Sequence, residues 1–400
     1  MRRNYNVKKI LILGGSEFQI PLVKCAKEKG FIVGVVDINK NAPACKYADY
    51  IFEQSLKDRE AVLEVAKQFS PDGITVGMVD VAVQTCAYVL SKLNLPGMDE
   101  ETAFRATDKH EMIKAFKKYG VPHPEFVYIS KGEIDNVEVG MGYPLIVKPV
   151  DMAGSRGIFL VNSKQELRDA IVKSSAISDR GDVIVEEYLD GPEVSVELVI
   201  KEGNPEVIQV TDKTTSGAPH FAEIGHLQPS QLSDDIILKI KDVACSAAKS
   251  LGLFNCLGHA EIKVTSKGPK MVEIGARAGG DGIAEQLIEL STGVSFCDMA
   301  LQIAVGEEII IPENRLNRAS CIRFILSKKG KLESISGVDE ARKIDGIVDI
   351  NINVVIGKQY QEMIDNSGRI GYVIASSDTA QKAKDACEEA IKCIIASYAQ

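Results

Sequence analysis

Hydrophobic runs and segments of helical periodicity alternate along the first hundred residues of the chain. The apolar, β-branched runs KILIL, IVGVVD and GITVG have the composition of buried strands. Apolar residues recur at helical spacing from Ile20 to Lys29, in AVLEVAKQF and in VQTCAYVLSKL. Because parallel strands need crossover helices that cover their sheet, this alternation predicts a Rossmann-like α/β unit over residues 1–102.

A different pattern begins near residue 103. A charged helix is predicted from Glu100 to Tyr119, and Pro122 and Pro124 then mark a boundary. Beyond it, PLIVKP, IFLVN and DVIVEEYL predict strands, and SKQELRDAIVKSS predicts a helix. These segments predict a compact α+β unit at about residues 120–187.

Longer strands are predicted in EVSVELVI and EVIQVTDK and in the pair HAEIKV and MVEIGAR, with a helix in SDDIILKIKDVACSAAKSLGL. From about residue 307, the shorter strands CIRFILS, IVDININV and RIGYVIASS precede a helix predicted in DTAQKAKDACEEAIKCIIASY. The chain is therefore expected to be an α/β and α+β protein of three domains, residues 1–102, 103–306 and 307–400.

Two carboxylates in the pair HAEIKV and MVEIGAR point to a metal. If this hairpin closes symmetrically about Lys267, Glu261 and Glu273 lie directly opposite each other. Like charges opposed across an antiparallel pair are destabilising unless a cation lies between them. A divalent ion held by a carboxylate pair and by substrate phosphates meets that need, whereas a solvated strand face is the simpler interpretation of one such pair.

The middle unit contains candidate phosphate-binding groups. Lys148 ends the strand LIVKP and shortly precedes Gly154, Ser155 and Gly157, so a cation and a pliable backbone rich in N–H donors occur together. The sequence contains neither a GxxxxGK[ST] loop nor the HRD and DFG motifs, which excludes Walker A proteins and protein kinases. After the strand DVIVEEYL, backbone groups at its end and the carboxylate of Glu193 offer contacts for an adenine ring and a ribose.

The charge and the cysteine content limit which classes of partner and which kinds of cysteine site are expected. The formal net charge is −9, and no basic cluster occurs, which argues against nucleic acid or an anionic membrane surface as the main partner. The nine cysteines occur singly, without CxxC spacing, so a zinc ribbon or a disulfide framework is not expected. No apolar run approaches membrane-spanning length, and we expect a cytoplasmic protein.

The order of these groups gives the chain a family resemblance. In sequence they are Lys109, Lys148, the glycine loop, the segment from Glu186 to Glu193, Glu261, Glu273 and Arg277. From about Leu11 to Glu307 the chain closely resembles the ATP-grasp superfamily, including the Rossmann-like domain that comes before its ATP-grasp core. The resemblance implies ATP and Mg²⁺ as cofactors, with Mn²⁺ as a possible substitute, and a mobile lid at about residues 120–187.

The resemblance also implies a role for each matching residue. Lys109 and Lys148 contact nucleotide phosphates, and Gly154, Ser155 and Gly157 belong to the lid loop. Arg277 steadies the transferred phosphoryl group or the acyl phosphate. The adenine contacts are Glu186, Tyr188 and Leu189, the ribose contact is Glu193, and the metal ligands are Glu261 and Glu273.

One position departs from the family pattern. Many ATP-grasp proteins have Glu-x-Asn on the second metal strand, whereas Gly275 follows here, so a second Mg²⁺ ion has fewer protein ligands. The sequence EIGARAGGDG is nevertheless similar to that of L-amino-acid ligases, and NSGRIG resembles part of their C-terminal domain. The similarity to L-amino-acid ligases implies an enzyme that phosphorylates a small carboxylate and joins it to an amine, such as an amino acid. It also implies a homodimer, the usual assembly of similar enzymes.

The segment GAPHFAEIGHLQP contributes further candidates. His220, Glu223 and His226 occur within seven residues, and substrate contacts are favoured over metal ligation for them. His259 lies two residues before Glu261 and is either a partner of that carboxylate or a buried structural histidine.

Three other functions remain open. A purine-pathway enzyme, phosphoribosylglycinamide synthetase-like or an ATP-dependent carboxylase, shares the same scaffold. An NAD-dependent oxidoreductase would use Gly14, Gly15 and Asp37, but the turn lacks GxGxxG spacing. A non-catalytic ATP sensor would bind the nucleotide without releasing phosphate.

Overall fold

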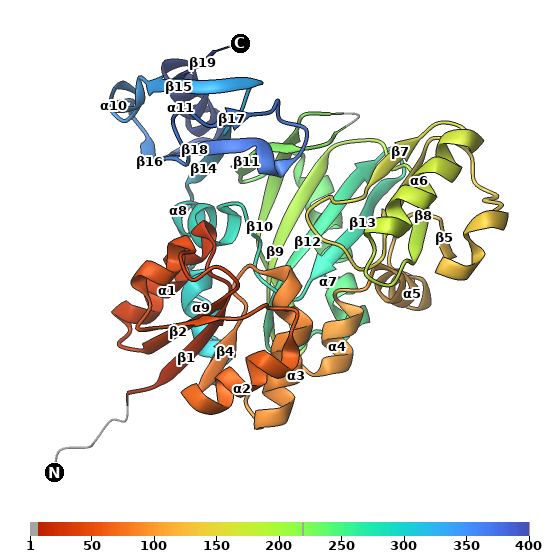
Figure 1. The fold of residues 1–400 in the computed structure, drawn as a ribbon, viewed down its shortest axis with the longest axis horizontal. Helices are drawn as coiled ribbons and strands as arrows, with labels where there is room; N and C mark the ends of the chain where they lie inside the picture. The colour runs from red at the N-terminus through yellow and green to blue at the C-terminus, as the bar shows by residue number, and fades with distance from the viewer. Residues whose placement is uncertain (1–6, 218–219, 400) are drawn as a thin grey trace.

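The computed structural model describes residues 7–217 and 220–399. A four-stranded parallel sheet lies nearest the N-terminus (Figure 1). Its strands, in order across the sheet, are β3 (Tyr50–Glu53), β2 (Ile32–Asp37), β1 (Lys9–Leu13) and β4 (Gly73–Thr75). Its helices are α1 (Ile20–Glu28), α2 (Arg59–Phe69) and α3 (Val83–Leu93). The predicted parallel α/β arrangement is confirmed, because β1 runs parallel to both β2 and β4.

The turn after β1 is held by the side chain of Asp37, the last residue of β2. Asp37 accepts hydrogen bonds from the Gly15 N–H and the Asn39 N–H, both at 2.8 Å. A Cβ at Gly14, where φ is +113°, would lie 2.7 Å from a methyl group of Val79. Both oxygens of Asp37 therefore accept hydrogen bonds from backbone N–H groups, and Gly14 and Gly15 belong to a turn that is packed against its neighbours.

The helix expected from Glu100 to Tyr119 is two helices, α4 (Glu100–Arg105) and α5 (Lys109–Tyr119). Asp108 breaks the pattern because its carboxylate accepts a hydrogen bond from the Glu111 N–H and caps α5. Because α5 begins as a separate helix, Lys109 is its first residue, close to the candidate site.

A small antiparallel sheet follows, on the right of Figure 1. Its strands are β5 (Phe126–Ile129), β8 (Val183–Glu187), β6 (Leu145–Pro149) and β7 (Phe159–Val161), and its helix is α6 (Lys164–Ile177). We call residues 126–187 the β5–β8 unit. It has a hydrophobic core of its own, with Leu145, Val147 and Ile171 at its centre.

An eight-stranded sheet occupies the middle of the molecule (Figure 1). Its order is β13 (Gly268–Gly275), β12 (Cys256–Thr265), β9 (Glu193–Lys201), β10 (Asn204–Thr215), β11 (Glu223–Gln228), β14 (Ala319–Leu326), β18 (Arg369–Ser377) and β16 (Ile347–Ile352). The long helix α7 (Asp234–Leu251) packs on it, and α8 (Ile288–Thr292) and α9 (Phe296–Ala304) follow β13. The sheet continues across residue 306 because β11 pairs with β14, and the three-domain division stays a prediction.

The C-terminal segment adds a three-stranded sheet. It consists of β17 (Gln359–Tyr360), β15 (Gly330–Ser336) and β19 (Ile395–Ala399), with α10 (Val338–Ala341) and α11 (Ala380–Cys393) beside it. The predicted last helix therefore ends at Cys393, and the following residues pair with β15 as a strand. The short helical turns are η1 (Glu17–Gln19), η2 (Pro43–Tyr47), η3 (Asp80–Ala82), η4 (Lys131–Asn136), η5 (Ile283–Leu287) and η6 (Asn366–Gly368).

All nine cysteines are free. Among the described residues, no single helix is both long and apolar enough to cross a membrane. One sharply bent pair, Ile283–Thr292 with Phe296–Ala304, meets the criteria of length and composition when its two helices are taken together.

Candidate active site

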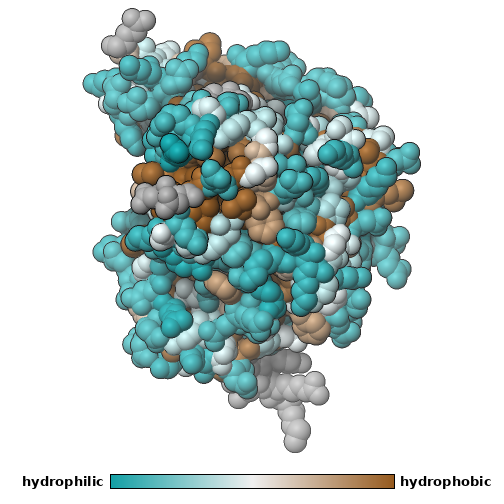
Figure 2. All heavy atoms as spheres, turned by 90° about the vertical axis from the view of Figure 1, so that its right-hand side faces the viewer, coloured by the Kyte–Doolittle hydropathy of each residue, from teal (hydrophilic) through white to brown (hydrophobic). Residues whose placement is uncertain are grey.

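A cavity of about 380 Å³ lies between the β5–β8 unit and the eight-stranded sheet. Figure 2 shows hydrophobic residues gathered near the middle of the face on this side of the molecule, with hydrophilic residues around them. The predicted site residues that line the cavity are Lys109, Lys148, Gly154, Ser155, Glu186, Tyr188, Leu189, Glu193, Glu223, Glu261, Glu273 and Arg277. The fold thus brings together residues from widely separated parts of the sequence.

Glu261 and Glu273 lie opposite each other on β12 and β13, as the hairpin pattern predicted. The pairing does not close symmetrically about Lys267, because Thr265 pairs with Gly268 across a two-residue turn. A bulge between Glu261 and Ile262 then shifts the register by one residue and brings the two carboxylates into opposition.

A lysine contacts each of these carboxylates. Lys109 Nζ lies 3.0 Å from Glu273 Oε2 and also donates to the carbonyl oxygen of Met152 at 2.7 Å. Burial alone would lower the pKa of Lys109, but Glu273 and Asp80 raise it above its usual value. The ammonium group is therefore held charged at the wall of the cavity.

Lys213, at the end of β10, contacts three carboxylates. Its Nζ lies 2.7 Å from Glu193, 2.9 Å from Glu223 and 3.0 Å from Glu261, and its side chain is 4% exposed. Burial opposes the charge, yet these carboxylates raise the pKa of Lys213 well above its usual value. Burial would likewise raise the pKa of Glu261, but Lys213 and His259 hold it well below its usual range. Lys213 and Glu261 are thus both ionised at neutral pH.

Lys148 and Glu186 form a buried ion pair of 2.8 Å across the neighbouring strands β6 and β8. Tyr188 follows β8, and its ring centroid lies 6.5 Å from that of Phe221. Leu189 is buried beside it. A charged pair and an apolar wall therefore lie together at this end of the cavity.

The glycine loop between β6 and β7 has an unusual backbone. Gly154, Ser155 and Gly157 all have positive φ, at +69°, +58° and +75°. Gly154 and Ser155 line the cavity, whereas Gly157 packs on Pro149, where a Cβ would lie 2.9 Å from Cγ. Residues with side chains rarely adopt this backbone, which explains the glycines on either side of Ser155.

Arg277 follows β13 and binds Asp80 from the N-terminal sheet unit, with 3.0 Å between Nε and Oδ1. Burial would raise the pKa of Asp80, but Arg277 holds it below its usual value. Gly275 contributes no side chain beside this pair, and a Cβ there would meet only ordinary contacts at 3.4 Å or more.

The part of the cavity around Arg369 contains two further carboxylates, Glu223 and Asp281. Arg369, on β18, binds Asp281 at 2.8 Å and Glu223 at 3.3 Å. Burial and the nearby carboxylate of Glu223 raise the pKa of Asp281 to about 6, although Arg369 opposes the shift. Asn366 also reaches this part of the cavity, where its Oδ1 accepts a hydrogen bond from the Glu223 N–H at 3.0 Å.

The two histidines of the predicted segment are in different environments. His220 lies in an exposed turn and does not line the cavity. His226 is fully buried, with Nε2 at 3.7 Å from Glu223 and no hydrogen-bond partner for either ring nitrogen. Burial lowers the pKa of His226 to about 3, so the ring is neutral.

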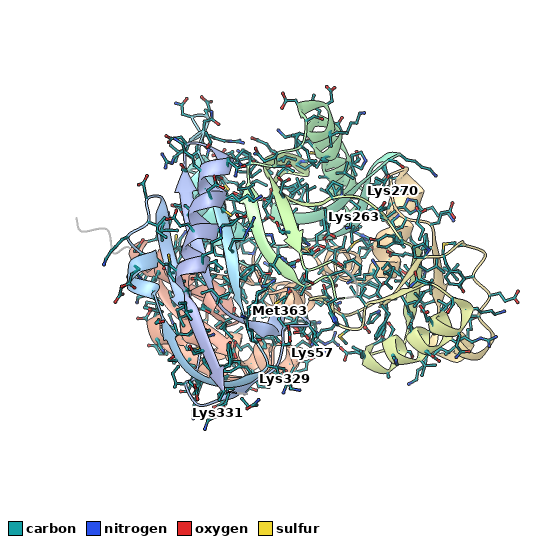
Figure 3. The ribbon with its side chains drawn as sticks, turned by 90° about the horizontal axis from the view of Figure 1, so that it is seen from above. Lys57, Lys263, Lys270, Lys329, Lys331 and Met363 are labelled. Carbon is teal, nitrogen blue, oxygen red and sulfur yellow. The ribbon has the colours of Figure 1, made fainter. Side chains whose placement is uncertain are left out.

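Other lysines lie around the cavity. Lys263 and Lys270, labelled in Figure 3, are opposite each other on the β12–β13 hairpin. Lys263 pairs with Glu193 at 3.3 Å, and Lys270 pairs with Glu187 of β8. These contacts connect the hairpin to the residues that frame the cavity.

The sequence pattern did not identify four residues of this site. They are Asp80, Lys213, Asp281 and Arg369. Lys213 lies in a predicted strand, whereas Asp80 lies between predicted elements. Asp281 and Arg369 belong to the sequences EIGARAGGDG and NSGRIG, which had been noticed without a role for either residue.

Comparison with known proteins identifies two family domains in the chain. Residues 141–285 match the ATP-grasp domain family, and residues 323–399 match the L-amino acid ligase C-terminal domain 2 family. The chain is 28% identical over 287 residues to alanine–anticapsin ligase of Bacillus subtilis, covering 66% of this chain and 60% of that protein. The chain thus spans about 60% of the length of that relative.

Two further relatives cover nearly the whole chain. Formate-dependent phosphoribosylglycinamide formyltransferase of Prochlorococcus marinus (strain NATL1A) is 26% identical, with 97% of each chain covered. The crystal structure of L-amino acid ligase from Bacillus licheniformis has the same fold, with a TM-score of 0.87, 24% identity, and coverage of 98% of this chain and 99% of that one. The chain therefore contains an ATP-grasp domain and an L-amino acid ligase C-terminal domain, and the family resemblance predicted from the sequence is confirmed over these residues.

Proposed function

We propose that this protein phosphorylates the carboxylate of an amino acid with ATP and joins the resulting acyl phosphate to an amine, forming an amide or dipeptide bond. The observation that supports this most is one cavity that brings lysines and the opposed Glu261 and Glu273 together with a further acidic pair. That pair is Glu223 and Asp281, which share Arg369.

The nucleotide would occupy the end formed by β6, β8 and the glycine loop. Lys148 and Lys109 are the cations for its phosphates, and the loop at Gly154–Gly157 would close over them as a lid. Tyr188 and Leu189 offer the apolar wall for adenine, with Glu186 beside it. Glu193 would accept hydrogen bonds from the ribose hydroxyls once Lys213 or Lys263 moves.

The residues around Glu261 fit Mg²⁺ or Mn²⁺. Two carboxylates face each other, and each already has an ammonium group at 3.0 Å, which is the place that a metal cation would take. Hard divalent cations prefer such oxygen ligands together with substrate phosphates. When bound, the metal would neutralise charge on the transferred phosphoryl group.

The part of the cavity around Arg369 would bind the ammonium group of the donor amino acid. Glu223 and Asp281 supply carboxylates, and Arg369 orients both of them. The neutral ring of His226 behind Glu223 adds no positive charge. Direct substrate contact is proposed for Glu223; His226 acts from behind it, and exposed His220 would reach the substrate only if its turn moved.

In the reaction, a carboxylate oxygen of the donor forms a bond to the γ-phosphorus of ATP as the bond to the ADP oxygen breaks. The amine nitrogen then bonds to the carbonyl carbon, phosphate leaves with the electrons of the C–O bond, and the nitrogen loses a proton. Lys109, Lys148 and Arg277 offset the negative charge of the phosphoryl group during transfer. A closed loop would keep water away from the acyl phosphate.

A second candidate is formate activation followed by transfer to phosphoribosylglycinamide, favoured by the relative that matches 97% of the chain. Such a substrate carries a phosphate, which needs cations that are free to bind it. The cations beside Glu223 and Asp281 are Lys213 and Arg369, and each already contacts two or more carboxylates. This arrangement therefore supports an amino acid over a sugar phosphate.

The first test is ADP and phosphate release with Mg-ATP across amino acids, singly and in pairs. Formate with phosphoribosylglycinamide, phosphoribosylamine with glycine, and bicarbonate are the control substrates, and Glu273→Gln is the inactive control protein. Release that needs an amino-acid pair supports the proposal. Release only with a control substrate refutes it, and release with none supports an ATP sensor.

The homodimer expected from the family resemblance stays a prediction. Sedimentation of the purified protein over a range of concentrations tests it.

A further inference from the structure

One fully buried carboxylate, Glu197 on β9, has no part in the proposed chemistry. One of its oxygens contacts Nδ1 of His259 on the neighbouring strand β12, and the other accepts a hydrogen bond from the Gly279 N–H at 3.0 Å. The side chain has no exposed surface. Each carboxylate oxygen of Glu197 therefore has a partner inside the protein, one on β12 and the other on the loop that contains Gly279.

His259 continues this chain of contacts to the metal pair. Its Nδ1 is engaged by Glu197, while its Nε2 lies 3.6 Å from Oε1 of Glu261. His259 itself is only 7% exposed, so water cannot readily replace Glu197 as its partner. The imidazole of His259 thus lies between the buried carboxylate of Glu197 and the carboxylate of Glu261 at the cavity wall.

The other oxygen of Glu197 fixes the loop after Arg277. A Cβ at Gly279 would lie 2.5 Å from Glu197 Oε1 and 2.7 Å from His259 Nδ1, so only glycine fits beside the pair. The same loop continues to Asp281, which lines the cavity and shares Arg369 with Glu223. Through His259, Glu197 therefore connects Glu261 on β12 to the loop that contains Asp281.

We infer that Glu197 and His259 are positioning residues, which hold Glu261 and the loop from Arg277 to Asp281 in register for the metal and the two substrates. The physical reason is that a metal-binding carboxylate without a fixed neighbour samples several rotamers, and ordering it on binding costs affinity. This inference rests on the proposed nucleotide and metal site.

A buried ion pair could instead serve only the stability of the sheet. That alternative predicts lower resistance to unfolding in variants, with unchanged metal affinity in the molecules that remain folded. The positioning role predicts weaker metal binding in the folded protein. Measuring metal binding without turnover separates the two, because no catalytic step contributes.

The experiment compares wild type with His259→Ala, His259→Gln and Glu197→Gln. Mn²⁺ affinity is measured by electron paramagnetic resonance with saturating ADP, ADP affinity is measured separately without metal, and thermal unfolding reports the fraction folded. Glu285→Gln is the matched control, because Glu285 is a buried carboxyl whose Oε1 binds the Gly282 N–H at 2.9 Å without a recorded contact to Glu261.

We expect His259→Ala and Glu197→Gln to weaken Mn²⁺ binding by about 10–100-fold, as loss of a residue behind a metal ligand typically does. ADP affinity without metal and the Glu285→Gln protein should stay within about twofold of wild type. His259→Gln retains a side-chain donor and should recover part of the affinity.

Mn²⁺ affinity within twofold of wild type in folded His259→Ala and Glu197→Gln would overturn the inference. If those two variants do not fold, His259→Gln decides: an affinity equal to wild type refutes the positioning role, and a weakened one supports it. Failure of the wild-type protein to bind Mn²⁺ with ADP would instead refute the proposed nucleotide site itself.

Discussion

Replacing Lys213 by methionine tests the electrostatic arrangement of the site. Methionine keeps an unbranched apolar stem of similar length but removes the ammonium group that lies within 3.0 Å of three carboxylates. Glu193, Glu223 and Glu261 would then face one another without a shared cation.

The expected loss of stability is large. Removing one partner of a buried ion pair typically costs about 3–5 kcal/mol, because a desolvated charge is left unpaired. Three carboxylates lose the same partner here, but they can take up protons, which limits the loss. We therefore expect the free energy of unfolding to fall by about 3–5 kcal/mol at pH 7.5 without divalent metal.

The sign of the pH dependence should also change. In the wild type, Lys213 holds the pKa values of Glu223 and Glu261 below their usual value against the effect of burial, so their contribution is present at neutral pH and lost on acidification. In Lys213→Met, burial and mutual repulsion raise these pKa values. The variant should then gain stability relative to wild type as the pH falls from 7.5 to 5.

Chemical denaturation at pH 7.5, 6 and 5 measures these differences, with and without Mn²⁺. The control is Lys164→Met, whose side chain is 61% exposed. A stability change below 1 kcal/mol at pH 7.5 that does not depend on pH would refute the claim that Lys213 neutralises this cluster.

Three further predictions concern single side chains. Glu273→Gln and Lys148→Ala should each abolish ATP turnover while leaving the circular dichroism spectrum unchanged; wild-type activity in both would contradict the proposed nucleotide geometry. Gly279→Ala should lower the thermal midpoint and weaken metal binding, because its Cβ would lie 2.5 Å from Glu197 Oε1; an unchanged protein would contradict that packing. Burial raises the pKa of Glu285 to about 8, so its unfavourable effect on stability grows as the pH rises from about 4.5 to 8. Glu285→Gln should therefore stabilise the protein by about 1–3 kcal/mol at pH 7.5, with the gain vanishing near pH 4.5, and a gain independent of pH in denaturation curves would contradict the assignment.

Local patterns determined much of the fold. The alternation of β-branched runs with amphipathic segments predicted the parallel sheet, since each signal lies within one element. Opposition of Glu261 and Glu273 was also predictable, because a hairpin pairs residues that are close in sequence. The opposition actually results from a two-residue turn and a bulge, which the assumption of a hairpin closing symmetrically about Lys267 did not reveal.

Elements whose form depends on distant partners were harder to predict. Asp108 interrupts a helical pattern because it caps a new helix, and the segment from Ile395 forms a strand because β15 offers it an open edge. The same holds for the site. Arg369 contacts Glu223 and Asp281, which come from much earlier segments of the chain. Lys213 of β10 contacts Glu261 of β12, and β9 lies between these two strands in the sheet, so the sequence near these residues does not indicate such partners.

The lysines that contact the metal carboxylates have a consequence for binding. A divalent cation at Glu261 and Glu273 must displace the ammonium groups of Lys213 and Lys109, whose side chains are 4% and 11% exposed. Lys109 would then lose its contact with Glu273, and Lys213 would keep only Glu193 and Glu223 of its three carboxylates. Nucleotide phosphates can supply new anionic partners for displaced ammonium groups. Metal and nucleotide should therefore bind cooperatively, each strengthening the other by the same factor.

Isothermal titration of Mn²⁺ in the presence and absence of ADP measures this coupling. A coupling of about 1–3 kcal/mol corresponds to a 5–150-fold tighter Mn²⁺ affinity with ADP present. Mn²⁺ also binds free ADP, so the titration is corrected with a protein-free series. In Lys213→Met one displacement is no longer needed, and Mn²⁺ alone should bind more tightly than to wild type. Equal Mn²⁺ affinity in the two proteins without ADP would mean that Lys213 does not compete for Glu261.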